Sequence, residues 1–210
     1  MNIRFFTLIF LIALLNNAFG GSSVPPPTSH IISVPATLKK DPAQKVRLGN
    51  FFINFETTTL SEISSAIHSG SIDHSGEAGS SQYWLCYSLP RQRIWFISNG
   101  EMGGREHALT QIHVISGTDF QGNASCPLLP KSFQPASFDF GWIGTDQGHL
   151  LDTLGPPSGK QGANHIYYYK GKKPAKIDSK VVEWDVVGYV EAKIVNGKIA
   201  SLYVSHVTSY

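Results

Sequence analysis

Apolar residues recur at helical spacing in the first half of the chain, at Leu60, Ile63 and Ile67. Thr59 precedes them and forms a Thr-x-x-Glu capping box with Glu62. In such a box, the side chains of both residues bind backbone N–H groups that the first helical turn leaves free. The pattern therefore predicts a short helix with one apolar face.

A second helical pattern lies in the other half, where Leu150, Leu151 and Leu154 share a face. Thr145 or Asp146 stands in position to cap its N-terminus. The sequence Gly-Pro-Pro follows Leu154 directly, and these residue types end helices. We therefore predict a second short helix that stops there.

The stretches after each predicted helix are rich in aromatic and β-branched residues, as is typical of strands. We expect three strands after the first helix and four after the second. The run 170–176, which has four lysines with glycine and proline, is predicted to be a solvated loop. The predicted strands are 83–89, 94–97, 109–115, 166–169, 181–187, 189–195 and 199–206.

Asn196-Gly197 connects the last two predicted strands, and two registers are possible there. A two-residue turn would place Ile194 opposite Ile199. A three-residue loop with Gly197 in the left-handed conformation would shift the pairing by one residue. We favour this second register because it gathers the apolar residues on one face. Those residues are Val190, Ala192, Ile194, Ala200, Leu202 and Val204.

The same order of helix, loop and strands occurs in both halves, and 109–114 aligns with 199–204. The sequence thus predicts an α+β fold of two tandem units. In each unit, a short helix or helix pair would pack on one face of a three- to four-stranded antiparallel sheet. We place the first unit at 47–120, a linker at 121–137 and the second unit at 138–210.

The N-terminal residues 1–20 have the features of a signal peptide. A positive start with Arg4 is followed by an apolar run at 5–15, and Ala18 and Gly20 form a small-residue cleavage site. No cysteine follows the run to accept a lipid, and no later stretch is apolar enough for a transmembrane segment. We therefore expect a periplasmic or secreted protein, with residues 21–46 as a proline-rich tether.

Cys86 and Cys126 are the only cysteines. An even number in an exported chain favours a disulfide between them. A nucleophilic Cys86 is the less favoured alternative, because it lies in the middle of a predicted strand rather than at a helix N-terminus. Unpaired cysteines in the core are the third possibility.

The composition limits the function classes. Charged residues make up 15% of the chain, and without Arg4 the 17 basic residues fall to 16, against 15 acidic ones. Because nucleic-acid binding requires clustered positive charge, we expect no nucleic-acid partner.

Candidate chemistry is sparse. The glycine-rich loop 99–106 could hold a ligand through Glu101 and Arg105, although a plain hairpin connection is the favoured interpretation. The histidines lack the spacing of a zinc helix, and no nucleophile elbow is present. We accordingly predict no catalytic residues, no metal site and no cofactor.

Gly144-Thr145, Leu154-Gly155-Pro156, the tyrosines at 167–169 and Asn196-Gly197-Lys198 make the second unit resemble the SmpA/OmlA family of small outer-membrane assembly lipoproteins. The tandem arrangement is similar to that of β-lactamase inhibitory proteins. These resemblances imply helices on one face of each sheet and an open face that receives a protein partner. The lipoprotein cysteine of the first family is absent from this chain.

The function that these observations favour is non-enzymatic binding of an unidentified protein in the bacterial envelope or exterior. Aromatic side chains on an open sheet face would serve as anchors, although for any single one of them a place in the core is the favoured interpretation. Inhibition of a secreted enzyme is one alternative, and hydrolysis without a recognisable motif is another. The candidate anchors are Trp84, Trp95, Tyr167 and Tyr169.

Overall fold

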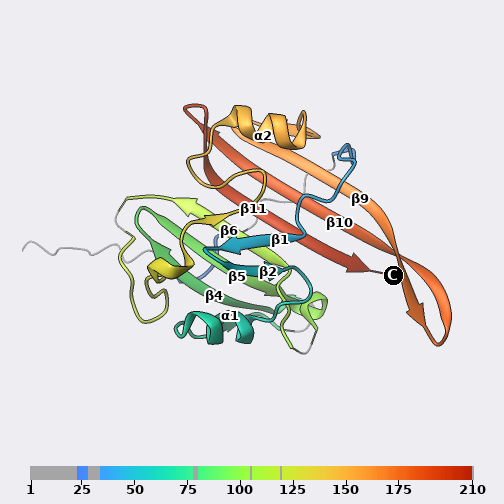
Figure 1. Cartoon of the computed structure of the whole chain (residues 1–210), viewed down its shortest axis with the longest axis horizontal. Helices are drawn as coiled ribbons and strands as arrows, with labels where there is room; N and C mark the ends of the chain where they lie inside the picture. Colours follow the sequence, from blue (N-terminus) through green and yellow to red (C-terminus); the bar gives the residue numbers. More distant parts are fainter. Residues whose placement is uncertain (1–22, 28–33, 78–79, 105, 119, 210) are drawn as a thin grey trace, which may run out of the picture.

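The computed structural model describes residues 23–27, 34–77, 80–104, 106–118 and 120–209 (Figure 1). One antiparallel sheet of eight strands dominates it, and a three-stranded sheet lies in front of its middle. In spatial order the large sheet contains β3 (Asp73–Ser75), β4 (Gln82–Leu89), β5 (Gln92–Asn99), β6 (Gln111–Ser116), β11 (Lys198–Ser209), β10 (Lys180–Val195), β9 (Asn164–Ile177) and β8 (Gly159–Gln161). The small sheet contains β2 (Phe51–Asn54), β1 (Lys45–Leu48) and β7 (Ala136–Ser137), and the helices are α1 (Leu60–Ile67) and α2 (Gln147–Leu154).

The predicted α+β class with two separate small sheets is wrong. Strands account for 49% and helices for 13%, so the fold is mostly β. The strands predicted for the two units pair with each other through β6 and β11 and form one sheet, with Val114 opposite Leu202. The physical reason is that each separate sheet would have left a long edge strand with unpaired backbone N–H and C=O groups. Pairing of β6 with β11 satisfies these groups.

The large sheet has the same strand order in both directions from its central pair. One half runs β6, β5, β4, β3 and the other runs β11, β10, β9, β8. His113 pairs with Tyr203 at the centre, between the pairs Val114–Leu202 and Ile112–Val204. Shifting 109–114 by the 90 residues of the predicted alignment places it on 199–204, and this exchange converts the pair Val114–Leu202 into the pair Ile112–Val204, so the register is unchanged. A duplicated unit would give such a register, and the duplication itself stays a prediction.

Both helices start at the predicted caps. The Glu62 N–H donates to the Thr59 hydroxyl at 3.1 Å, and the Thr59 N–H donates to the Glu62 carboxylate at 2.7 Å. In α2, Asp146 accepts from the Gly148 N–H at 2.8 Å, and Gly155 ends the helix with φ of 79°. The predicted capping box and the N-cap role of Asp146 are thus confirmed.

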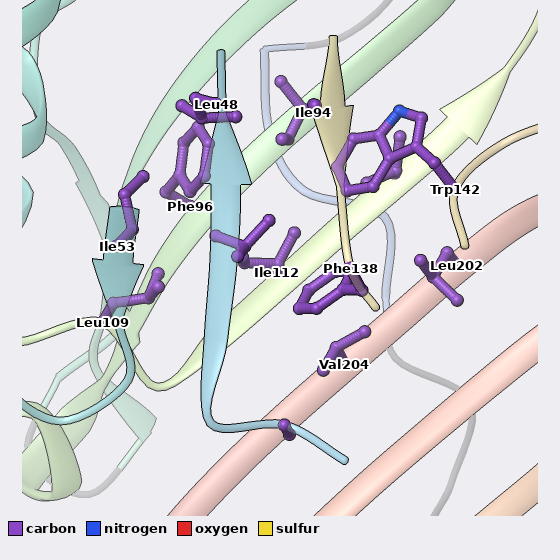
Figure 2. Close-up of a cluster of buried hydrophobic side chains, with 14 of the residues drawn as sticks. Leu48, Ile53, Ile94, Phe96, Leu109, Ile112, Phe138, Trp142, Leu202 and Val204 are labelled. Carbon is purple, nitrogen blue, oxygen red and sulfur yellow. The ribbon is translucent and has the colours of Figure 1, made fainter. Parts of the chain in front are cut away.

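One face of the large sheet, here called the inner face, carries the main hydrophobic core. Side chains of the small sheet and of the segment after β7 point toward those of the large sheet (Figure 2). The labelled side chains are all buried, so this face is closed by layers of the same chain. The labelled side chains from the covering layer are Leu48, Ile53, Phe138 and Trp142, and those from the large sheet include Ile94, Phe96, Ile112, Leu202 and Val204.

The turn at Asn196-Gly197 combines features of both registers considered. Both residues have positive φ, and Ile194 pairs with Ile199 across a two-residue turn. A bulge at Lys193/Ile194 then makes Ala200 the extra residue, so that Ala192 pairs with Leu202. The apolar residues beyond the bulge therefore share the inner face as predicted, although the turn is the shorter one.

The lysine run 170–176 is a strand and not the predicted loop. It forms part of β9, which pairs with β10 as a two-stranded ribbon that extends beyond the end of β11 (Figure 1). Lys172 lies opposite Asp185, and their side chains form an ion pair at 2.8 Å. Acidic residues on β10 thus offset part of the positive charge of this run. Pro174 is tolerated there because, among the described residues, no strand pairs with the other side of β9 at this point.

Candidate functional site

The four predicted aromatic anchors do not form one exposed face. Trp84 and Trp95 lie on the opposite side of the large sheet from the core, here called the outer face, and both are buried. Tyr167 pairs with Val190 and is fully buried in the inner core, whereas Tyr169 is half-buried. Strand alternation sends these side chains to two faces, so they share no exposed face, and their role in binding stays a prediction.

The predicted loop site is only partly described. Glu101 lies in the short 3-10 helix η2 (Gly100–Gly103), and its side chain is outside the described part of the structure. Arg105 lies outside the described residues altogether, as does the predicted signal peptide at 1–20. The ligand site proposed for this loop therefore stays a prediction.

The predicted disulfide between Cys86 and Cys126 is confirmed. Cys86 is on the outer face of β4, and the bridge packs with Trp84, Trp95 and Ile97 in a second, smaller hydrophobic cluster. Cys126 belongs to the predicted linker, and its neighbours bind the backbone of β4. The Ser88 N–H donates to Pro127 at 2.8 Å, and the Leu129 N–H donates to Ser88 at 2.9 Å. The disulfide therefore fixes the linker against the outer face.

The segment Ser23–Pro27, predicted to be part of a loose tether, lies against the outer face. The indole N–H of Trp95 donates to the carbonyl of Ser23 at 2.8 Å. His113 on β6 forms a hydrogen bond with the backbone of Pro26, and since proline has no N–H, the acceptor is its carbonyl. Two side chains of the sheet thus bind backbone carbonyls of an extended proline segment.

His113 acts as a neutral donor in this contact. Burial lowers its pKa to about 4, and the hydrogen bond to Pro26 offsets only part of that effect. The imidazole therefore carries no charge at neutral pH, when one ring nitrogen can donate and the other cannot. The contact to the segment is thus a neutral hydrogen bond in a buried setting.

Ser23–Pro27 does not fill the outer face. A hollow of about 390 Å³ lies between the segment and Arg93, Trp95 and Ile115. A second hollow of about 170 Å³ continues past Pro27 over β6, β11, β10 and β9. We call these two hollows with the segment between them the outer groove. The second hollow is lined by His113, Asn164, Glu191, Lys193, Ser201 and Tyr203.

Glu191 is the acidic group at the far end of the outer groove. Its carboxylate accepts from the Asn164 amide at 2.7 Å and from the Tyr189 hydroxyl at 3.2 Å. Burial, followed by the negative charge of Glu191, raises the pKa of Tyr189 well above its ordinary value, so the phenol stays protonated and donates. The groove thus ends in a preorganised polar group.

A buried ion cluster anchors the chain after this segment to the inner face. His206 on β11 lies between two carboxylates, with Asp41 at 2.6 Å from Nδ1 and Glu56 at 3.1 Å from Nε2. Glu56 also accepts from the Thr208 N–H at 2.5 Å. Gly188 pairs with His206 on the neighbouring strand, and a Cβ there would collide with the Asp41 carboxylate. Glycine is therefore required for this close approach.

The contacts within the cluster shift the pKa values of Glu56 and His206 so that both groups are charged at neutral pH. Burial alone would raise the pKa of Glu56, but hydrogen bonds from His206 and Thr208 outweigh it and lower the pKa to about 2. Burial alone would lower the pKa of His206, but hydrogen bonds to Asp41 and Glu56 raise it to about 9. Each ring nitrogen contacts one of the two carboxylates. At neutral pH His206 is therefore a positively charged ion-pair partner and not a proton shuttle.

Other features of the described residues add little chemistry. No group of three or more His, Cys, Asp or Glu side chains among them is arranged to hold a metal ion. Neither of their α-helices has the length and apolar character needed to cross a bilayer. Comparison with protein-family models, with curated proteins and with solved structures found nothing that matches this chain.

Sequence reasoning missed the residues that form the outer groove contact. Ser23 and Pro26 lie in the predicted tether, and the histidine spacing indicates no site at His113. The available signal was the Pro-Pro-Pro run, whose extended carbonyls need donors from elsewhere if they become buried. No pattern in the sequence indicates that Trp95 and His113 supply these donors.

Proposed function

We propose that this protein is a non-enzymatic binding protein of the bacterial envelope or exterior, and that its outer groove receives an extended, proline-containing segment of a partner protein. The observation that carries the proposal is the contact already made in the groove. Trp95 and His113 bind the carbonyls of Ser23 and Pro26, as a receptor binds a peptide.

The chemistry of the contact fits this class of ligand. An extended proline segment has no internal hydrogen bonds, so its carbonyls are free to accept from a receptor. It is also stiff before binding, so it loses little conformational entropy on docking. Tryptophan is a favoured receptor residue because its ring packs on proline while its N–H donates, and Trp95 does the latter here.

The resident segment is suited to exchange. Its described contacts with sheet side chains include the two hydrogen bonds above, and the side chain of Val24 remains 52% exposed. The hollows beside it leave space for a longer peptide. A partner segment would replace Ser23–Pro27 and extend toward Glu191.

Export and the nature of the partner rest on sequence features. The signal-peptide pattern of residues 1–20 and the Cys86–Cys126 disulfide both support an oxidising compartment. The resemblance to SmpA/OmlA proteins and to β-lactamase inhibitory proteins supports a protein partner. A fusion of residues 1–25 to a reporter tests export, and retention of the reporter in the cytoplasm contradicts it.

Binding is tested with the mature chain and a labelled peptide Ser-Ser-Val-Pro-Pro-Pro-Thr, using fluorescence anisotropy. A variant with Pro25→Gly and Pro26→Gly weakens the resident segment, so it should bind the added peptide more tightly than the parent does. A peptide with three glycines in place of the prolines is the matched ligand control and should bind more weakly. Equal binding of both peptides to the variant contradicts the proposal.

The donor is tested in the same weakened background. Trp95→Phe keeps an aromatic ring but removes the N–H. Since a hydrogen bond contributes about 0.5–1.5 kcal/mol, we expect the proline peptide to bind roughly 2- to 10-fold more weakly. An unchanged affinity would remove Trp95 from the site and with it the basis of the proposal.

A further inference from the structure

The segment Thr37–Pro42 forms a strap across the inner side of the molecule. At one end, the Thr37 hydroxyl lies 2.6 Å from the Ser158 hydroxyl, and the Thr37 and Leu38 N–H groups donate to the Tyr168 carbonyl at 3.1 and 3.2 Å. At the other end, Asp41 forms its ion pair with His206. The strap is therefore fastened on both sides of Lys39 and Lys40.

A cleft of about 660 Å³ lies between the strap and the end of α2. Leu154 and Pro156 form its far wall, and Leu38 and the buried Phe140 also line it. Clefts of about 300–1,000 Å³ with mainly apolar walls and a few polar groups are the usual sites of small ligands. This cleft has both properties, and it is distinct from the outer groove, with which it shares no lining residue.

Positive side chains outnumber free carboxylates at the cleft. Lys39 and Lys40 line it from the strap, and neither forms an ion pair within the described part of the chain. The carboxylate of Asp41 is already taken by His206 and by the Ala43 N–H. Asp139 on the opposite side is the remaining acidic lining residue, so the two lysines leave an excess of one positive charge.

The charge is distributed unevenly across the cleft, with a positive side at the strap and a negative side at α2. The C-terminus of α2 lies at the far wall, where the last helix carbonyls carry partial negative charge. Asp139 adds to that negative side. An anionic group is therefore favoured at the strap, beside Lys39 and Lys40, and an apolar body fits against Leu154, Phe140 and Pro156.

From this geometry we infer that the cleft binds an amphipathic anion, that is, a single carboxylate or similar acidic group on an apolar chain or ring. The apolar part lies between the strap and α2, and the acidic group pairs with the strap lysines. This inference is independent of the proposed peptide binding, since the two sites are lined by different residues.

Isothermal titration of the mature chain with dodecanoate, below its micelle concentration, tests the inference. Dodecanoate should bind, and dodecanol, which has the same chain without the charge, should bind about tenfold more weakly. The double variant Lys39→Gln and Lys40→Gln should reduce the dodecanoate affinity about tenfold and leave that of dodecanol unchanged. Both lysines are exposed, so the variant keeps the fold.

A matched control variant loses two positive charges at the ribbon instead of the strap. Lys170→Gln with Lys176→Gln changes two exposed lysines on the ribbon and should leave the dodecanoate affinity unchanged. Absence of dodecanoate binding, equal affinity for dodecanol, or an equal loss in both double variants overturns the inference. Trp95→Phe separates the two sites, because it should weaken the proline peptide and leave dodecanoate binding unaltered.

Discussion

The two faces of the same eight-stranded sheet are closed in different ways. On the inner face, the small sheet, both helices and Trp142 add layers that pack into one large apolar core. On the outer face, a small cluster surrounds the disulfide, polar side chains such as His113 are buried, and a short proline segment lies across the rest.

The difference lies in what holds each cover in place. The inner cover consists of elements that form their own hydrogen-bonded structure, so removing it would unfold the chain. The segment on the outer face is attached by side-chain contacts to its carbonyls, and a competing peptide could reproduce these. The inner face therefore contributes most of the stability, and the outer face is the one that we propose for exchangeable binding.

The largest effect is expected from the inner core. Phe96 is fully buried between the sheet and its covering layer, so Phe96→Ala should destabilise the protein by about 3–5 kcal/mol, toward the upper end. Urea unfolding measures this loss. Phe52→Ala makes the same change at a side chain that is 53% exposed, and its loss should stay below about 1 kcal/mol. Similar losses in both variants would contradict the assigned roles.

The disulfide is a strong contribution to stability on the outer face. Its cysteines are 40 residues apart, and closing a loop of that size contributes about 4 kcal/mol in the chain-entropy model. Cys86→Ser with Cys126→Ser should lower the free energy of unfolding by about that amount. Because the disulfide packs with Trp95 in the outer cluster, the variant should also lose affinity for the proline peptide; unchanged affinity would separate the disulfide from the groove.

The ion cluster makes stability depend on pH. The pKa of His206 is raised to about 9, so its contribution is complete below its unfolded value of about 6.5 and is lost as the pH rises through 9. The pKa of Glu56 is lowered to about 2, so its contribution exists above about 4.5 and is lost as the pH falls toward 2.

Removing the imidazole by His206→Gln leaves Asp41 without its cation and Glu56 with only Lys173 at 3.6 Å, and should cost about 3 kcal/mol at pH 7. Thermal unfolding between pH 5 and 10 measures the effect. The gap between the parent and the variant should narrow above pH 9, whereas a constant gap across this range would show that the charge of His206 does not contribute.

The smallest expected effect comes from removing a single hydrogen bond on either face. Trp95 donates to Ser23 on the outer face, and Trp142 donates to the Gln92 side chain at 2.8 Å on the inner face. Each Trp→Phe change should cost about 1 kcal/mol in unfolding experiments. Only Trp95→Phe should alter binding of the proline peptide; an equal effect of Trp142→Phe on binding would erase the distinction between the faces.

Local features of the fold were predictable from the sequence. The capping box at Thr59 and the cap at Asp146 depend on residues within one helical turn, and both formed as expected. The aromatic stretch 83–89 became β4, and the two cysteines paired. The helix caps and the strand depend on residues close together in the sequence, and each cysteine has only one other cysteine with which it can pair.

Contacts between distant segments were not predictable in the same way. Nothing in 109–115 or 199–206 alone shows that these strands would pair with each other and merge two sheets into one. The lysine run was assigned to a loop because its partner acids, such as Asp185, lie on another strand. The groove was missed for the same reason, since a carbonyl such as that of Ser23 carries no side-chain signature.

The ion pair between Asp41 and His206 also bears on the order of folding. It joins a residue near the start of the described chain to one on the last strand, so it cannot form until β11 has been synthesised and placed beside β6. Contacts between such distant residues close large loops and are expected late in folding. A chain that stops before β11 would leave the edge of β6 open and Asp41 without its cation, and proteases would find both exposed.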